Sequence, residues 1–463
     1  MYICKTNYNH PKRDLSSVLK CITYISLLIA SCCTNVSYAV DLKSSLESTY
    51  NTNEDISKSQ TNFLNQIERF SSALSEFLPH VVGHATMRDQ KFFDESGTKL
   101  GELKDQISTD ISIEQNLFRG GSSIANLKAA KSIFRSAKSS LYQEEQDIML
   151  KSIEAYLGYL ESKKIYDISN SAVAFRQKQF DLMQAKFKLG EANKTALAFS
   201  EGGLFEAKSL RSKYFAILEQ AKAKFQQLIG LKPDSVEALP VPAIAEDFTT
   251  FNDKVLANNF ALTSAKHMLE ASKLVIYSSA AALLPQVDAY CTWENNNKTS
   301  RSNDPSQNFT TGVRLTVPIF ERGGARYSEI RKARNQSRIS ALQLDQVIKS
   351  LQTDIISKWE SYVSLKESLN SARSMVSAYT LAVEGVTKEF SLGIKSILDV
   401  LEIEQKLVDS QIQQAKIESN YFLQMYALKS SMGELTAQKL ELKVKLFQPD
   451  REFNKMKIKI IGI

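Results

Sequence analysis

Apolar residues recur every seven positions in the last third of the chain, within an interval between Pro318 and Pro449 that contains no proline. Seven consecutive heptads are typical of a coiled-coil seam, and the 69 residues from Arg322 to Phe390 would form a helix of about 100 Å. A single helix of that length would expose its seam, so we expect several helices to pack side by side. The two apolar stripes are Ile348, Ile355, Tyr362, Leu369, Val376, Val383 and Phe390, and Leu344, Leu351, Leu365, Ala372, Tyr379 and Val386.

Four other stretches alternate apolar and polar residues, which is the period of a β-strand. The clearest runs from Phe309 to Ile319, and the others lie around Val81, Ile107 and Val287. Strands of about 10 to 13 residues with one apolar face suit a transmembrane β-barrel, and they equally suit two soluble hairpins packed on helices. Four strands cannot close a barrel, and an open sheet edge cannot face lipid. A barrel therefore requires several chains, and three copies would supply twelve strands.

The chain contains two copies of one pattern. Gly120, Gly190 and Gly230 each have a counterpart 203 positions later, and the Leu-Pro pairs that end at Pro79 and Pro285 are 206 positions apart. A constant offset over so many residues predicts a tandem duplication. We therefore expect a leader at 1–39, a first repeat at 40–232 (strands about 80–118, helices about 119–230), a linker at 233–245, a second repeat at 246–437 (strands about 286–320, helices about 322–437) and a basic tail at 438–463.

The net charge of +7 is concentrated at the two ends of the chain. Four of the basic residues lie in the first 20 positions, and the C-terminal segment after Lys439 is also basic. The remaining body is close to neutral, so no basic face indicates nucleic-acid binding. We expect the basic stretch from Lys455 to Lys459, with the terminal isoleucines, to be a flexible end.

The amino terminus has the pattern of a secretory signal. Basic residues precede an apolar run from Cys21 to Cys33, and Ser37-Tyr38-Ala39 supplies a small-x-small cleavage site. An alternative is a lipoprotein box that ends at Cys32, where the chain would be cut and acylated. We favour cleavage after Ala39, which would leave Cys291 as the single cysteine and exclude an intramolecular disulfide.

No catalytic or metal-binding constellation stands out. His80 and His84 lie on the polar face of a predicted strand, and the Gly-Gly pairs at 120 and 323 are not followed by the Lys-Ser/Thr of a phosphate-binding loop. We therefore expect no enzymatic activity, no cofactor and no bound metal.

Taken together, these features resemble the TolC family of outer-membrane efflux channels. The most specific match is the segment from Phe390 to Glu402, in which an aromatic-x-x-Gly turn is followed by Ile-Leu-Asp-Val-Leu. The resemblance implies a mainly α-helical homotrimer with a 12-stranded β-barrel in outer-membrane lipid and a tunnel of long antiparallel coiled-coil helices in the periplasm. It implies a passive exit duct, of a tripartite efflux pump or a type I secretion system, that receives substrate from an inner-membrane transporter through a periplasmic adaptor.

The resemblance also assigns roles to residues at the turns of the long helices. Glycine tolerates the left-handed conformation that reverses a chain, so Gly190 and Gly393 mark two helix hairpins. The family's adaptor contacts and hairpin turns fall on Phe187, Leu189, Gly190, Leu392 and Gly393.

Beyond the second turn, Asp399 and Glu402 are three residues apart and share a helix face. In a trimer each would form a ring of three carboxylates, and such rings select cations in narrow pores. The resemblance implies that these rings lie at a periplasmic aperture, and that Lys395 and Phe390 link its closed state. Phe390 lacks the hydroxyl of the family's usual Tyr, Lys395 replaces Arg, and Ala196 occupies the position of a gating carboxylate.

One alternative remains open at this stage, namely a periplasmic coiled-coil adaptor without a pore of its own. A duct needs its four strands in lipid and shared between chains, whereas an adaptor would bury them in small domains. The sequence does not indicate whether the substrate is a drug, a toxin or a protein.

Overall fold

The computed structural model describes residues 41–458 except 234–236, 238–241, 243–246 and 298–303. The predicted signal segment 1–39, with its alternative acylation site at Cys32, lies outside the described residues, as does most of the predicted linker. The helices are α2 (Leu42–Thr52), α3 (Glu54–Ser75), α4 (Ser122–Lys188), α5 (Lys194–Ile229), α6 (Phe248–Asn258), α7 (Phe260–Ala281), α8 (Ala325–Ser391), α9 (Ile397–Ser431) and α10 (Pro449–Ile458), with a 3-10 turn η1 at Glu321–Gly324.

The two halves of the chain repeat the same elements at matching lengths. Helices α4 and α8 both have 67 residues, α3 and α7 both have 22, and α2 and α6 both have 11. The capping residues are repeated as well, since Asp41 and Asp247 each accept a hydrogen bond from the backbone three residues later. Asn53 and Asn259 likewise cap α3 and α7. The duplicated pattern therefore corresponds to a duplicated succession of helices.

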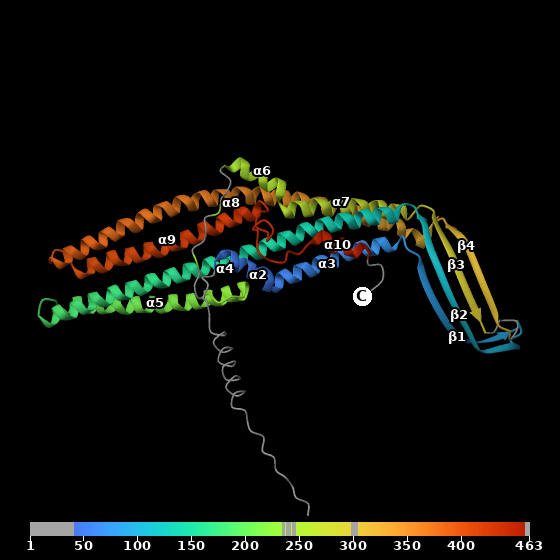
Figure 1. Cartoon of the computed structure of the whole chain (residues 1–463), viewed down its shortest axis with the longest axis horizontal. Coiled ribbons are helices and arrows are strands. Elements are labelled where there is room, and N and C mark those ends of the chain that lie inside the picture. The colour runs from blue at the N-terminus through green and yellow to red at the C-terminus, as the bar shows by residue number, and fades with distance from the viewer. Residues whose placement is uncertain (1–40, 234–236, 238–241, 243–246, 298–303, 459–463) are drawn as a thin grey trace, which may run out of the picture.

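The long helices form one layer that is four helices wide (Figure 1). On one flank, α4 contacts α3 near the sheet and α5 near the opposite end; on its other flank it contacts α7 and α9. Helix α8 lies beyond α7 and α9 and forms the far edge. The middle of the layer is more buried than its edge. In α4, 24 residues are buried, whereas only 9 are buried in α8, which has the same length.

The four strands form one antiparallel sheet at one end of the layer (Figure 1). They are β1 (His80–Phe93), β2 (Lys99–Arg119), β3 (Gln286–Asn296) and β4 (Ser306–Thr316), and their order is β1-β2-β3-β4. β1 and β2, with 14 and 21 residues, extend beyond the length that alternation predicted. β4 ends earlier than predicted, at Thr316, because Pro318 has no amide hydrogen for the ladder.

Register places side chains of like polarity in rows across the sheet. Gly83, Ile111, Trp293 and Phe309 are cross-strand partners on one face, where many large apolar side chains are exposed. The other face carries polar pairs, in which His84 Nδ1 lies 3.0 Å from Asp110 Oδ2 and Arg314 Nη1 lies 3.6 Å from Glu114 Oε1. The sheet thus has one apolar and one polar face, as the alternation predicts.

The heptad stripes of α8 lie on its packed side. Leu351, Ile355, Leu369, Ala372 and Phe390 are buried, and the remaining stripe positions are partly buried. They pack against α6, α7 and the end of α9 in one apolar cluster, and against the turn regions in another. The periodicity therefore identified the packed face of this helix correctly.

The C-terminal segment packs on the helix layer, and the expected flexible end was wrong for Lys455 to Ile458, which belong to α10; residues 459–463 lie outside the described residues. Gln146 and Glu145 of α4 accept hydrogen bonds from the backbone N–H groups of Leu435 and Ala437, at 3.1 and 2.6 Å. Further along, Phe453 of α10 is 5% exposed and stacks on Phe134 of α4 with ring centroids 3.9 Å apart. The many basic residues of this segment suggested a solvent-exposed end. Its few apolar side chains are nevertheless buried against the helix layer.

Candidate periplasmic aperture

The two hairpin turns lie at the end of the layer remote from the sheet (Figure 1). Gly190 and Gly393 adopt φ angles of +79° and +78°, which side chains with a Cβ rarely adopt. Each glycine N–H donates to the carbonyl of the aromatic residue three positions earlier, Phe187 or Phe390, at 3.1 Å. The sequence-predicted turns are therefore the structural turns.

The predicted adaptor-contact residues project from these turns. Leu189 and Leu392 occupy equivalent positions and are both 74% exposed, while Phe187 is 41% exposed. Ile394 is exposed as well. Apolar side chains in this arrangement offer a surface to a partner, because no neighbouring element of the described chain covers them.

Behind the turns, the two hairpins pack against each other through an apolar cluster. A cavity of about 340 Å³ adjoins it and is lined from both hairpins, including Lys395 and Phe390. Ala196, at the position of the expected carboxylate, packs in the same cluster and supplies no polar group. The buried members are Met183, Phe390, Ile397, Val400 and Leu401, and the partly buried ones are Phe175, Ala192, Ala196, Leu197 and Val386.

Asp399 is partly exposed and forms a capping box with Ser396, the N-cap residue of α9. Its Oδ2 atom accepts hydrogen bonds from the backbone N–H of Ser396 at 2.8 Å and from the Ser396 hydroxyl at 2.7 Å. These bonds, with a smaller contribution from the positive charge of Lys395, lower the pKa of Asp399. The carboxylate therefore stays ionised and fixed near the turn.

Glu402 lies one turn further along α9, and its charge is shared with a lysine. Its Oε1 atom lies 2.8 Å from Nζ of Lys406, and this bond raises the pKa of Lys406. On the first turns of α9, Glu402 is exposed and Asp399 is partly exposed. Sequence reasoning missed the role of Lys406, although its i,i+4 spacing from Glu402 signals such a pair.

Phe390 is 8% exposed, and a lysine of the other hairpin contacts its ring. The ammonium group of Lys186, on α4, lies 4.8 Å from the centroid of its ring. Lys395 follows the turn, and its backbone N–H donates to the carbonyl of Glu389 at 3.4 Å. The position that lacks a hydroxyl is thus linked across the hairpins by a cation–π contact.

A buried ion pair joins the hairpins further from the turns. Nη2 of Arg176 on α4 lies 2.6 Å from Oε2 of Glu404 on α9, and both side chains are almost completely buried. Burial raises the pKa of Glu404, and the charge of Arg176 opposes this shift. Sequence reasoning missed the pair. Its signal was a charged residue at a seam position, because Arg176 continues the heptads of Leu141, Ile148 and Ala155.

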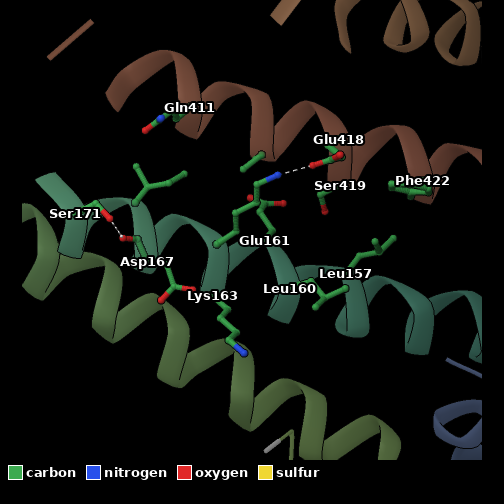
Figure 2. Close-up of a pocket in the computed structure, with 13 residues that line it drawn as sticks. Leu157, Leu160, Glu161, Lys163, Asp167, Ser171, Gln411, Glu418, Ser419 and Phe422 are labelled. Carbon is green, nitrogen blue, oxygen red and sulfur yellow. Dashed lines mark hydrogen bonds and ion pairs between the residues drawn. The ribbon is translucent and has the colours of Figure 1, made fainter. Parts of the chain in front are cut away.

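Still further from the turns, a groove of about 740 Å³ separates α4 from α9 (Figure 2). Its apolar lining includes Leu157, Leu160 and Phe422. Lys164 of α4 bridges the groove to Glu418 of α9, with Nζ 2.6 Å from Oε2. The hairpins are therefore held together by separate polar contacts along their length.

Neither a metal centre nor a membrane-spanning helix is found within the residues that the structure describes. Groups of three or more His, Cys, Asp or Glu side chains that could hold a metal are absent from this part of the chain. None of its helices combines the length and hydrophobicity needed to cross a membrane.

Comparison with known proteins shows which proteins the chain resembles. Residues 252–434 match the family described as outer membrane efflux protein. The outer membrane efflux protein BepC of Brucella suis is 23% identical over 424 residues, which is 91% of each chain. The outer membrane protein TolC of Vibrio cholerae is 22% identical over 387 residues, or 80% of this chain and 85% of that protein. The chain is therefore similar to TolC and related outer membrane efflux proteins along most of its length.

Solved structures agree with this similarity. The CmeC outer membrane channel of Campylobacter jejuni superposes with a TM-score of 0.76 at 13% identity, over 91% of this chain and 90% of that one. The outer-membrane channel OprN gives a TM-score of 0.73 at 16% identity, over 85% and 89% of the two chains. The mostly helical fold with its curled sheet is therefore that of TolC-family channels.

These similarities place the chain in the outer membrane, with its helical part projecting into the periplasm. Its relatives are efflux channels and not enzymes, which is consistent with the expectation of no catalytic activity. The similarities favour the efflux channel over the alternative of a periplasmic adaptor.

Proposed function

We propose that three copies of this chain form a passive exit duct, with a 12-stranded barrel in the outer membrane and a coiled-coil tunnel that is gated at its periplasmic end. The observation that carries the proposal is that sheet and helix layer both end in open edges. β1 and β4 each have one neighbouring strand within the described chain. Unpaired backbone groups cannot face lipid, so β4 of one copy would pair with β1 of the next.

The edges of the helix layer support the same assembly. Helix α8 forms one edge, and α5 forms the other at the hairpin end. Both present large exposed apolar side chains, which soluble surfaces rarely gather along one helix. Packing α8 of one copy beside α3 and α5 of the next would bury them and close a tunnel. These residues are Ile339, Leu342, Ile356, Val363 and Leu381 on α8, and Phe199, Phe205 and Phe215 on α5.

The polarity of the sheet supports a barrel with a water-filled interior. Its apolar face would contact lipid, and its polar face, with His84, Asp110, Glu114 and Arg314, would line the lumen. The repeats at 40–232 and 246–437 would each contribute two strands and one long helix hairpin to every third of the duct.

The residues at the turns then acquire their proposed roles. Asp399 and Glu402 form rings of carboxylates at the aperture that favour cations, while Phe390 and Lys395 link its closed state. A periplasmic adaptor contacts the exposed turns around Leu189 and Leu392, and an inner-membrane transporter delivers the substrate. Among the relatives, one is an alkaline protease secretion protein and another a pyoverdine export outer membrane protein. The duct would thus serve a tripartite efflux pump or a type I secretion system.

The test is the mobility of the detergent-extracted protein on a denaturing gel, with and without heating. We expect a heat-sensitive band near three chain masses in the membrane fraction, and ion conductance when that species is inserted into a planar bilayer. A monomer that remains in the aqueous fraction and forms no conducting species would refute the duct.

A further inference from the structure

We propose that Arg176 is an internal tie of each subunit, which holds hairpin α4–α5 to hairpin α8–α9 and must release α9 when the periplasmic end opens. This proposal rests on the duct proposed above. It assigns control of opening to a buried contact within one chain, whose Glu404 lies two residues beyond the exposed Glu402 on α9.

The guanidinium of Arg176 makes several contacts with one neighbouring helix. Its Nη2 atom lies 2.6 Å from Glu404 Oε2, and it donates to the backbone carbonyl of Leu401 at 2.9 Å and to Oε1 of Gln405 at 3.4 Å. All three acceptors belong to α9, whereas Arg176 belongs to α4. Separation of the two helices would therefore break all of these contacts together.

Because the contact between Arg176 and Glu404 is buried, it restricts the distance between the two hairpins. Arg176 is 5% exposed and Glu404 is 3% exposed, so neither charge reaches water while the helices are packed. A guanidinium stays charged at any physiological pH, and leaving it buried without its acceptors is costly. The two helices must therefore either stay in register or separate far enough to hydrate both charges.

A glycine on a third helix makes room for the guanidinium. At Gly203 of α5, an added Cβ would lie 3.0 Å from Nη1 of Arg176, which is closer than normal packing allows. At the preceding Gly202 an added Cβ would meet nothing within 4 Å. Of these two adjacent glycines, only Gly203 thus leaves space that the guanidinium occupies. Arg176 lies where α4, α5 and α9 meet.

The tie lies several helical turns behind the two hairpin turns. Arg176 precedes Gly190 by 14 residues and Glu404 follows Gly393 by 11, which corresponds to about 16 to 21 Å of helix. The apolar cluster around Phe390 lies between the tie and the turns. The hairpin ends beyond the tie can therefore move only as far as this contact permits.

The test compares the gating of four proteins, the wild type and three variants, each purified as a trimer and inserted into a planar bilayer. Arg176→Met keeps a long buried side chain but loses the ionic contacts, and Gly203→Val displaces the guanidinium from the α5 side. We expect both to raise the ratio of open to closed dwell times about tenfold or more. Gly202→Val, the same substitution one residue earlier in the same helix, should match the wild type.

Folding and packing are checked in the same preparations. Each variant should retain the heat-sensitive trimer band, and Arg176→Lys, which keeps the charge without the planar fork, should gate between wild type and Arg176→Met. Hydrogen exchange of the segment 397–408 should be faster in Arg176→Met and Gly203→Val than in Gly202→Val. The raised pKa of Glu404 favours folding of Arg176→Met, because the carboxyl group can remain buried in its protonated form.

Two results would overturn the tie, and they separate it from the duct. In Arg176→Met and Gly203→Val, hydrogen exchange of 397–408 could be faster while the ratio of open to closed dwell times stays that of the wild type. Arg176 would then contribute to packing alone, so the proposed tie would be wrong while the proposed duct would stand. If wild-type trimers conduct no ions at all, the duct and the tie are both wrong.

Discussion

The ammonium group of Lys186 lies 4.8 Å from the centre of the Phe390 ring, so a cation of one hairpin rests on an aromatic residue of the other. Phe390 is 8% exposed and belongs to the cluster that joins the hairpin ends. A ring without a hydroxyl can still bind a cation through its π face. Phe390, which lacks the hydroxyl expected at this position, thus still makes a contact between the two hairpins.

Removal of this cation–π contact should loosen the closed aperture. Lys186→Gln removes the charge, and we expect the ratio of open to closed dwell times to rise about twofold to fivefold, from a contact of about 0.5 to 1 kcal/mol. Lys208→Gln is a matched control, because Lys208 lies 5.5 Å from the ring of Phe205 within α5. Equal effects of the two substitutions in single-channel recordings would contradict the role of Phe390.

Neutralising the acidic residues at the start of α9 should change ion selectivity. In Asp399→Asn/Glu402→Gln, we expect the permeability ratio of K⁺ over Cl⁻ to fall by about half or more, because the carboxylate rings are lost. The Asn side chain retains an oxygen that can accept the hydrogen bonds from Ser396, so the start of the helix is preserved.

Lys406→Gln should act in the opposite direction. Lys406 partly neutralises Glu402 at 2.8 Å, so its removal should raise the K⁺ preference. The control is Lys222→Gln, which breaks a similar exposed pair with Glu219 on α5. Reversal potentials in a salt gradient measure all of these variants, and an unchanged ratio in Asp399→Asn/Glu402→Gln would exclude the rings.

Glu145 should make the stability of the protein depend on pH. Burial raises its pKa to about 7, against a hydrogen bond from the N–H of Ala437 that lowers it. The folded chain therefore holds this proton more tightly than the unfolded chain, so stability should fall as pH rises from about 4.5 to 7 and then level off. Glu145→Gln keeps the acceptor without the charge.

We expect the free energy of unfolding of Glu145→Gln to exceed that of the wild type by about 3 kcal/mol per chain at pH 8 and to match it near pH 4.5. Thermal unfolding of purified trimers at these two pH values provides the measurement. A wild type and a variant that differ equally at both pH values would show that ionisation of Glu145 is not the cause.

Phe453 should contribute strongly to the attachment of the C-terminal segment. Its ring stacks on Phe134 at 3.9 Å and meets Phe70 edge-on at 4.7 Å. Phe453→Ala should cost about 3 to 5 kcal/mol and lower the temperature at which the trimer dissociates. Arg451→Ala, in the same helix but exposed, should leave that temperature nearly unchanged. A C-terminal segment that remains cleavable by protease in the wild type would argue against this attachment.

Local patterns in the sequence predicted the elements because each depends on neighbours in the chain. Heptads identified the packed face of α8, alternation identified the four strands, and Gly190 and Gly393 identified the turns. Prediction was weaker where pairing extends an element. β2 begins at Lys99, in a polar stretch without alternation, because the backbone of β1 continues to pair with it.

The tertiary structure alone decided which distant residues meet. Arg176 and Glu404 come from different repeats, and so do Lys186 and Phe390. Their contacts depend on which flank of α4 receives α9, and periodicity specifies a packed face without specifying its partner. The C-terminal segment shows the same limit, because Phe453 is buried only where α3 and α4 together provide an apolar surface. The sequence by itself thus determined helices, strands, turns and their duplication, whereas side-by-side packing decided the contacts that join the two hairpins.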